Sequence, residues 1–203
     1  MDYKIYKSGS QGNLSVINNV IVDFGVSLKE FKSLVDLEGI KYALVTHKHR
    51  DHLNFPVLKY LIKNNIKVYT NYETYDYIIN NASFKREFVF GLSILEPGDY
   101  LMIENFMIKA YAGIHDADVN IYEFSDSNEN LIYATDTKSF INVPNIKYDY
   151  LLIEFNYDNE NINIEEHKNS ARHSSIINSQ IFCDDHKKEN SVIVKLHESR
   201  RFF

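Results

Sequence analysis

Short apolar segments with the alternation of β-strands gather in two groups along this chain, and helical segments lie between them. The predicted strands are Tyr3–Tyr6, Leu14–Ile17, Val20–Asp23, Tyr42–Val45, Val68–Thr70, strands within Leu92–Tyr111 around a Pro97-Gly98 turn, Val119–Phe124, Leu131–Ala134, Tyr150–Ile153 and Val192–Leu196. The predicted helices follow Ser27 and cover Phe55–Ile62, Tyr72–Ile79 and about Ser174 to Phe182. This order predicts an α/β fold, a four-layer αββα sandwich of two sheets covered by helices.

Length and composition set the broad class of the protein. The 203 residues are 44% hydrophobic, which fits one globular domain spanning residues 1–203. The chain has no apolar run of membrane-spanning length and no signal-peptide pattern, and its one cysteine, Cys183, cannot form an intramolecular disulfide. We therefore expect a cytoplasmic protein without a membrane partner. The formal net charge of −6 argues against broad adhesion to nucleic acid but leaves room for a local basic groove.

Metal-binding side chains are concentrated in the segment THKHRDH, residues 46–52. Three histidines and an aspartate directly follow an apolar strand, a pattern that packing alone does not explain. The alternating His47 and His49 can face one ion, while Asp51 and His52 face a neighbouring ion. Imidazole suits zinc, iron and manganese, and a carboxylate extends the range toward harder metals. The alternative is a solvated histidine-rich loop that binds metal adventitiously.

The HxHxDH pattern is the signature of the metallo-β-lactamase superfamily, and further motifs resemble that superfamily in the same order. The matching residues after the opening SGSQGN are Asp23 in VIVDFG, His115 in AGIHDAD, Asp136 in IYATDTK and His197 in VKLHESR. Asp23 resembles the aspartate that braces the histidine loop. These motifs run from Ser8 to Arg200, so the resemblance covers nearly the whole chain and implies its hydrolase fold.

The resemblance also implies a division of labour between two divalent metal ions. One ion would be held by His47, His49 and His115, and the other by Asp51, His52 and His197. Asp136 would bridge the two ions beside a shared water, whose pKa would fall to roughly 7 to give a hydroxide at neutral pH. Asp51 would also orient that hydroxide. Zinc is the first expectation for the metal, with manganese or iron as alternatives.

Details of the motifs favour one branch of the superfamily, the phosphodiesterases that include tRNase Z and small single-domain nucleases. True β-lactamases usually use a cysteine ligand and lack a histidine at the position that His52 occupies here. Glyoxalase-type thioesterases have a Thr-Pro-Gly-His segment, which this chain lacks. In the phosphodiesterase branch a buried acid and a histidine transfer a proton beside the metals. Glu154 in LLIEFNYD resembles the acid, and His173 in ARHSS resembles the histidine, followed by Ser174.

The chain also departs from that branch. Tyr157 stands where the small nucleases have a histidine, and Arg172 stands where a glycine usually precedes the catalytic histidine. The chain has no room for the tRNA-gripping arm of tRNase Z, which argues against tRNA maturation. Three residues are candidates for substrate binding: Arg172, Ser174 and Arg200. The arginines, with Arg201, could converge on a phosphate near the metals, or they could be solvated surface charge.

The sequence therefore predicts a dinuclear metal-dependent phosphodiesterase that acts on a nucleotide or on single-stranded nucleic acid. A nuclease and a cyclic-nucleotide phosphodiesterase both remain open. A thioesterase or lactonase that uses the same metals is the alternative from another chemical class, and a non-enzymatic metal-binding module is a further one. Dimerisation is common in this branch, so a homodimer is an expectation from the resemblance alone.

Overall fold

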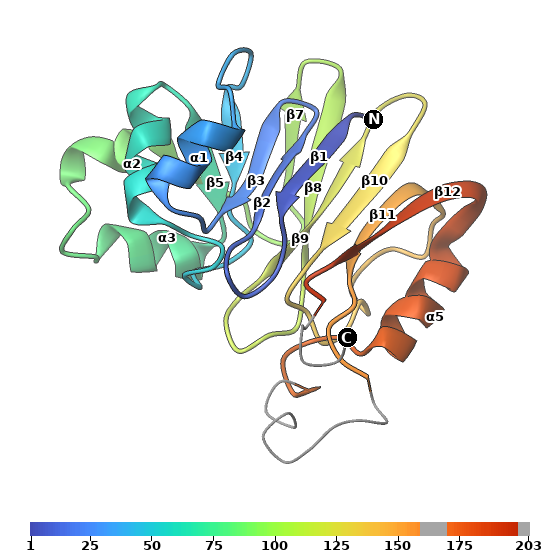
Figure 1. Cartoon of the computed structure of the whole chain (residues 1–203). Coiled ribbons are helices and arrows are strands. Elements are labelled where there is room, and N and C mark those ends of the chain that lie inside the picture. The colour runs from blue at the N-terminus through green and yellow to red at the C-terminus, as the bar shows by residue number, and fades with distance from the viewer. Residues whose placement is uncertain (159–169, 199–203) are drawn as a thin grey trace. The chain divides into compact units, whose positions relative to one another are not determined.

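The computed structural model describes residues 1–158 and 170–198, which form two compact units. The first unit spans Met1–Glu96 and the second spans Pro97–Phe203, and each contains one six-stranded sheet (Figure 1). A mixed α/β fold with two sheets and flanking helices confirms the predicted fold class. No helix in the described part of the chain is long and apolar enough to cross a membrane.

The sheet of the first unit has the strands in sequence order, β1-β2-β3-β4-β5-β6. Its strands are β1 (Tyr3–Lys7), β2 (Leu14–Ile17), β3 (Val20–Phe24), β4 (Tyr42–Leu44), β5 (Lys67–Thr70) and β6 (Leu92–Ile94), and its helices are α1 (Leu28–Leu34), α2 (Phe55–Lys63), α3 (Tyr72–Ile79) and the 3₁₀-helix η1 (Arg86–Gly91). β1, β2 and β3 pair antiparallel, whereas β3 to β6 pair parallel. Parallel neighbours need crossover connections, which the helices supply.

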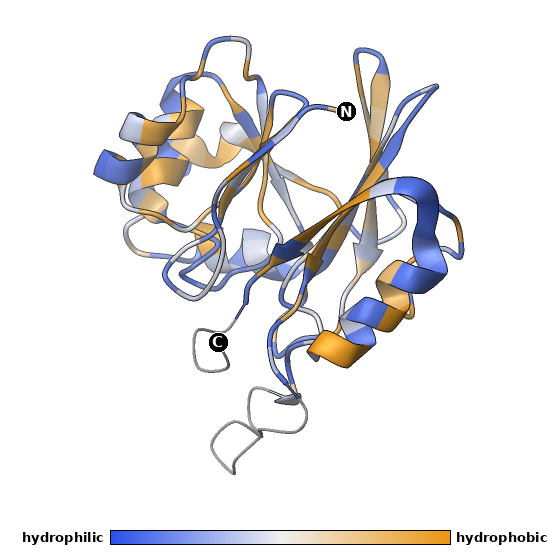
Figure 2. Ribbon diagram, turned by 45° about the vertical axis from the view of Figure 1, so that its right-hand side comes forward, coloured by the Kyte–Doolittle hydropathy of each residue, from blue (hydrophilic) through white to orange (hydrophobic). Residues whose placement is uncertain are grey.

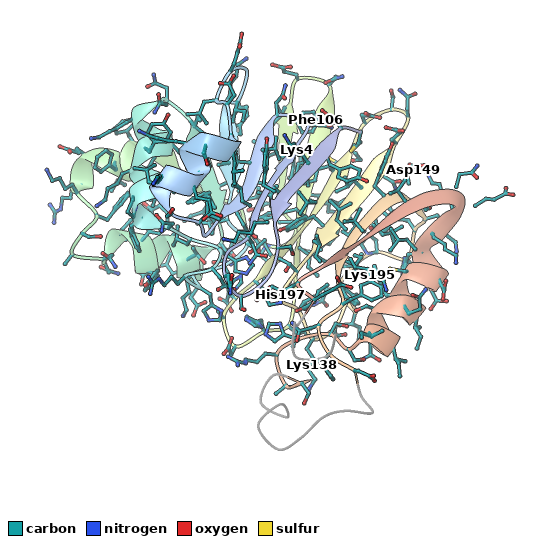
Figure 3. The ribbon with its side chains drawn as sticks, viewed as in Figure 1. Lys4, Phe106, Lys138, Asp149, Lys195 and His197 are labelled. Carbon is teal, nitrogen blue, oxygen red and sulfur yellow. The ribbon has the colours of Figure 1, made fainter. Side chains whose placement is uncertain are left out.

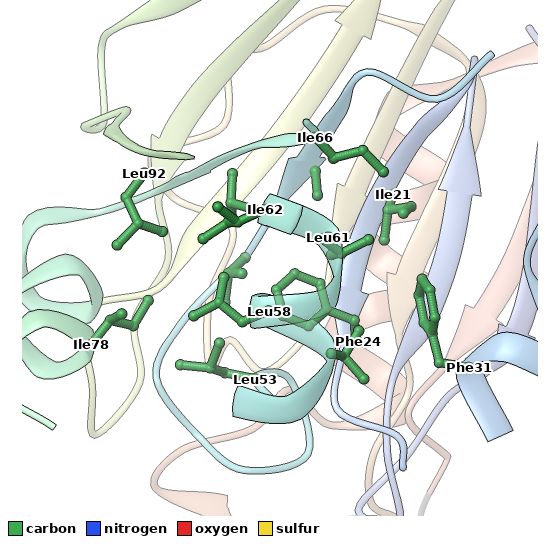
Figure 4. Close-up of a cluster of buried hydrophobic side chains, with 14 of the residues drawn as sticks. Ile21, Phe24, Phe31, Leu53, Leu58, Leu61, Ile62, Ile66, Ile78 and Leu92 are labelled. Carbon is green, nitrogen blue, oxygen red and sulfur yellow. The ribbon is translucent and has the colours of Figure 1, made fainter. Parts of the chain in front are cut away.

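Polar side chains begin the three α-helices of this unit, because each cap accepts a hydrogen bond from a first-turn backbone N–H. Ser27 caps α1, Asn54 caps α2 and Asn71 caps α3. The helices bury apolar side chains in one cluster, which Figure 4 shows around Phe24, Leu58 and neighbouring residues. This core fixes the carboxyl end of β4, where the histidine segment begins.

The sheet of the second unit has the order β12-β11-β10-β9-β8-β7. Its elements are β7 (Tyr100–Ile103), β8 (Phe106–Ala112), β9 (Asn120–Ser125), β10 (Asn130–Ala134), β11 (Tyr148–Glu154), α5 (Ile176–His186) and β12 (Lys187–Leu196). β7 to β10 pair antiparallel, and β10, β11 and β12 pair parallel. Hydrophobic and hydrophilic residues interleave along α5 (Figure 2), and its buried Phe182 stacks on Phe140 at a centroid distance of 4.4 Å.

The predicted helices and strands are present with shifted ends, and the strands predicted around Pro97-Gly98 are divided between the two sheets. The stretch predicted as strands around Pro97-Gly98 contains three strands. β6 belongs to the first sheet, whereas β7 and β8 belong to the second. The last helix starts two residues later than predicted, at Ile176, because the side chain of Ser175 caps it. The final strand begins at Lys187, five residues earlier than the apolar pattern indicated. Its first residues are exposed and polar, so the hydrophobic pattern did not mark them as part of a strand.

Candidate metal centre

The histidine loop, residues 46–52, leaves the end of β4 with its imidazoles gathered close together. His47 and His52 are fully buried, and their ring centroids lie 4.2 Å apart. Nε2 of His47 lies 2.9 Å from Nδ1 of His49. The loop is closed by backbone bonds from His52 and Leu53 to the carbonyl of His49, at 3.0 and 2.9 Å. Ring nitrogens that converge in this way form a donor set suited to a divalent ion.

Asp23 braces this loop from the end of β3. Its backbone adopts φ of 58°, and its carboxylate is fully buried. One oxygen accepts the backbone N–H of Thr46 at 2.8 Å, and the other lies 2.8 Å from Nδ1 of His52. A carboxylate accepts only, so Nδ1 of His52 carries the proton and Nε2 keeps its lone pair. Asp23 therefore fixes the tautomer in which His52 can act as a metal ligand through Nε2.

Asn13 and Gly25 hold the other side of the loop, and the sequence interpretation did not assign them a role. The backbone N–H of Asn13 donates to the carbonyl of Asp51 at 2.7 Å, and its side-chain Nδ2 lies 2.9 Å from Nε2 of His52. A Cβ on Gly25 would lie 1.9 Å from the carbonyl carbon of Asp51. The glycine is therefore needed for backbone to pass backbone at this point. The sequence signals were their places in quoted motifs: Asn13 ends the segment SGSQGN, and Gly25 ends VIVDFG.

The second unit carries its own cluster, built around Asp136. This residue follows β10 with φ of 49° and is 2% exposed. One of its carboxylate oxygens lies 3.6 Å from Nε2 of His197, and the other lies 4.0 Å from Nε2 of His115. His197 stands just after the end of β12 (Figure 3) and also has a positive φ, of 50°. A carboxylate that faces two different imidazoles has the geometry expected of a bridging ligand.

Glu154 and His173 form a buried pair within the same unit. Oε1 of Glu154, at the end of β11, lies 2.6 Å from Nδ1 of His173. The other carboxylate oxygen accepts backbone N–H groups from Thr137 at 2.9 Å and Ser174 at 3.3 Å. The ring of His173 stacks on His197 at 5.2 Å. Asp136, Glu154, His173 and His197 offer ligand atoms within 4.8 Å of one another.

Burial and charge act in opposite directions on this pair. Burial would raise the pKa of Glu154, but the charge of His173 and the hydrogen bonds from His173 and His197 lower it below its ordinary value. Burial would lower the pKa of His173, but the charge and hydrogen bond of Glu154 raise it. The pKa of His115 is lowered, chiefly by burial. The paired histidine is thus favoured as a proton donor, while His115 is favoured as the neutral imidazole that a metal requires.

The candidate substrate-binding residues have structural contacts of their own. The guanidinium of Arg172 donates to Asp116 at 2.9 Å, and its carbonyl oxygen lies 2.9 Å from Nδ1 of His115. Ser174 is fully buried, with its hydroxyl 2.9 Å from that of Ser179. Arg200 lies outside the described residues, as does Arg201. Substrate binding by these residues stays a prediction.

The predicted ligands lie together within each unit. The histidine loop brings together His47, His49, Asp51 and His52, and the second unit brings together His115, Asp136 and His197 near the Glu154–His173 pair. The orienting residues Asn13 and Gly25 were missed because their roles depend on contacts with segments far away in the sequence.

Several solved structures resemble the chain at low sequence identity. The metallo-β-lactamase fold protein YhfI from Bacillus subtilis is 15% identical with a TM-score of 0.68, and the match covers 98% of this chain and 86% of the YhfI chain. The short form of human tRNase Z is 15% identical with a TM-score of 0.70, covering 99% and 94%. A variant of the β-hydroxylase CmlA is 13% identical with a TM-score of 0.58, covering 91% and 44%.

No protein-family model matches the sequence, and no curated protein matches it. The similarity to solved structures therefore rests on shape, and it shows that the chain has the metallo-β-lactamase fold. The fold and the clusters of histidine and carboxylate side chains suit a metal-dependent hydrolase.

Proposed function

We propose that this protein is a dinuclear metal-dependent phosphodiesterase that hydrolyses a phosphodiester bond in a nucleotide substrate. The observation that carries the proposal is the 2.6 Å pair of Glu154 and His173, buried beside Asp136 and His197. The leaving group of a nucleotide phosphodiester is an alkoxide, which needs a proton, whereas the thiolate that leaves a thioester is stable near neutral pH. A buried histidine whose pKa is raised by the charge and hydrogen bond of a glutamate suits the first reaction.

The proposal assigns the metal ligands as the motif order implies. His47, His49 and His115 would hold one ion, Asp51, His52 and His197 would hold the other, and Asp136 would contribute a carboxylate to both. Two observations within the units support this set: Asp23 leaves the lone pair of His52 on Nε2, and each oxygen of Asp136 faces a different histidine. When bound, two divalent cations supply Lewis-acid activation of a water and of a phosphoryl oxygen. Zinc, manganese and iron all suit imidazole with carboxylate.

His173 has the task of protonating the leaving oxygen. Nδ1 faces Glu154, so Nε2 is the atom that carries the transferable proton. Glu154 is itself held by backbone N–H groups of Thr137 and Ser174, which fixes the direction of the ring. Further support is the similarity in shape to tRNase Z, whose name describes a nuclease acting on tRNA.

The first experiment is a turnover panel with added zinc or manganese. It compares 5′-labelled single-stranded DNA and RNA with 3′,5′-cyclic mononucleotides, a thioester and a lactone, and it includes Asp51→Ala as the inactive control. Cleavage of polymers would make the protein a nuclease, and cleavage confined to cyclic nucleotides would make it a cyclic-nucleotide phosphodiesterase. Hydrolysis of only the thioester or lactone, by protein shown to carry two metals, would refute the proposal.

The role of His173 is tested by changing the leaving group. We expect His173→Gln to lower kcat on the nucleotide substrate by about 100-fold or more, the usual contribution of general acid catalysis. The same variant should retain most of its activity on bis(p-nitrophenyl) phosphate, whose nitrophenolate leaves without a proton. His186→Gln is the matched control, because His186 contacts only the Ile146 carbonyl and the rings of Phe182 and Tyr148 among the contacts described. Equal losses on both substrates would argue against proton transfer by His173.

A further inference from the structure

The first unit contains a cavity of about 540 Å³ beside the histidine loop. It is lined by Lys48, Glu73, Asp76, Tyr77, Asn80, Asn81 and Ala82. Lys48 stands between the predicted metal ligands His47 and His49, and most of the other lining residues lie on α3 or directly after it. The cavity therefore starts at the loop that the proposed chemistry uses and extends along α3.

The end of the cavity at the histidine loop holds a lysine ammonium paired with a carboxylate. The ammonium group of Lys48 forms an ion pair with Glu73, and the Lys48 side chain is 31% exposed. An ammonium group has three N–H donors, so the ion pair with one carboxylate leaves donors for a second anion. Lys48 is the cation among the residues that line the cavity, so a phosphate bound there would be attracted to it.

The other end of the cavity offers hydrogen-bond acceptors. It holds the carboxylate of Asp76 and the carboxyl end of α3, which carries the negative end of the helix dipole. Nδ2 of Asn80 donates to Asp76 at 2.9 Å, so the oxygen of the Asn80 amide is turned to accept from elsewhere. This end disfavours a phosphate and favours a ligand that presents N–H groups.

An aromatic ring stands in the same cavity. Tyr77 is 44% exposed, and its ring packs against Phe55 at a centroid distance of 6.0 Å. A ring held on one side and open on another is a platform for stacking, and base–aromatic stacking tolerates any base. The cavity thus offers a ring on which a base can stack, acceptors for an amino group of the base and a cation for the phosphate. These three features together complement a nucleotide.

We propose that this cavity binds the base of the substrate nucleotide, stacked on Tyr77, with its exocyclic amino group donating to Asp76 and Asn80 and its phosphate directed toward Lys48. The assignment rests on the proposed function for the identity of the substrate. It predicts a preference for adenine, guanine and cytosine over uracil and thymine, because the latter two lack an exocyclic amino group.

The test is equilibrium binding of adenosine, cytidine, guanosine and uridine to the full chain, with and without zinc. Nucleosides carry no phosphate, so their binding does not depend on hydrolysis. We expect the three amino-bearing nucleosides to bind more tightly than uridine, and Tyr77→Leu to weaken them about tenfold. Tyr77→Phe should retain binding, because the ring remains. Tyr72→Leu is the matched control, since Tyr72 lies on α3, is 62% exposed and does not line the cavity.

Two outcomes would overturn the assignment: nucleoside binding that Tyr77→Leu leaves unchanged, or no binding of any nucleoside. Asp76→Asn tests the base preference, because it replaces an acceptor with a donor and should reduce the discrimination against uridine. Failure of the proposed function would be seen separately, as absent phosphodiester turnover by zinc-loaded protein that still binds adenosine. Turnover of bis(p-nitrophenyl) phosphate without nucleoside binding would instead reject the cavity and leave the proposed function standing.

Discussion

Glu154 and His173 lie 19 positions apart in the sequence, yet Oε1 of Glu154 is 2.6 Å from Nδ1 of His173. The glutamate has no exposed surface, and the histidine side chain is 11% exposed. A charged carboxylate buried to this extent is stable only while its partners remain. The pair is therefore a structural element of the second unit as well as a candidate for proton transfer.

We expect Glu154→Gln to reduce the free energy of unfolding of the metal-free protein by about 3–5 kcal/mol, the usual cost of removing one partner from a buried ion pair. Urea unfolding followed by circular dichroism measures the change. Glu189→Gln is the control, because Glu189 is exposed on β12. A loss as small as that of the control would mean that the pair contributes little to stability.

Asp23→Asn should weaken metal binding although Asp23 is not a proposed ligand. The amide removes the charge that fixes the protonated Nδ1 of His52, and loss of such an orienting carboxylate typically costs about 10- to 100-fold in metal affinity. Competition with a chromophoric chelator measures the zinc affinity of each protein. The exposed Asp2, changed to Asn, supplies the comparison. Unchanged affinity in Asp23→Asn would show that the hydroxyl of Thr46, which lies 3.2 Å from Nδ1 of His52, orients the ring without the carboxylate.

Gly25→Ala should displace the carbonyl of Asp51, because the new Cβ would lie 1.9 Å from that group. We expect a loss of stability of about 1–3 kcal/mol and a lower zinc content per chain. Gly9→Ala is an informative control: Gly9 has φ of +125° but no atom within 4 Å of the added Cβ, so it reports backbone strain without collision. Elemental analysis and thermal unfolding of the two variants separate the two effects.

Two tyrosines contact the buried Glu123, and the raised pKa values of their phenols predict a loss of stability at alkaline pH. The hydroxyl of Tyr111 donates to Glu123 at 2.7 Å, and that of Tyr148 lies 3.5 Å away. Burial, together with the charge of Glu123, raises the pKa of both phenols above the ordinary value. Since the unfolded chain loses these protons at about pH 10, their stabilisation is complete below that pH and declines as the pH rises above it.

The measurement is the free energy of unfolding at several pH values on either side of about pH 10. The double variant Tyr111→Phe/Tyr148→Phe should show a shallower decline than the wild type. Tyr100→Phe, at a position 65% exposed, should follow the wild type. Parallel curves for all three proteins would remove the buried phenols as the cause.

Much of the fold and of the metal-ligand set could be predicted because the signals are local. The strand Tyr42–Val45 and the four ligand candidates of residues 46–52 are adjacent in the sequence. Hydrophobic periodicity depends on neighbours within about one turn, so α2 and α3 were predicted at nearly their observed bounds. The motif resemblance then supplied the order of the distant ligands.

Only the tertiary structure decided which distant residues hold those ligands in place. Asn13 and Gly25 act on the carbonyl of Asp51 across more than twenty residues, and Arg172 orients His115 through its backbone carbonyl, which no side-chain pattern encodes. Asp23, Asp136 and His197 adopt positive φ angles that strand propensity disfavours, and the surrounding hydrogen bonds stabilise them. The sequence determined which groups are present, and long-range packing determined their directions, because a side chain's orientation depends on neighbours that only folding brings near.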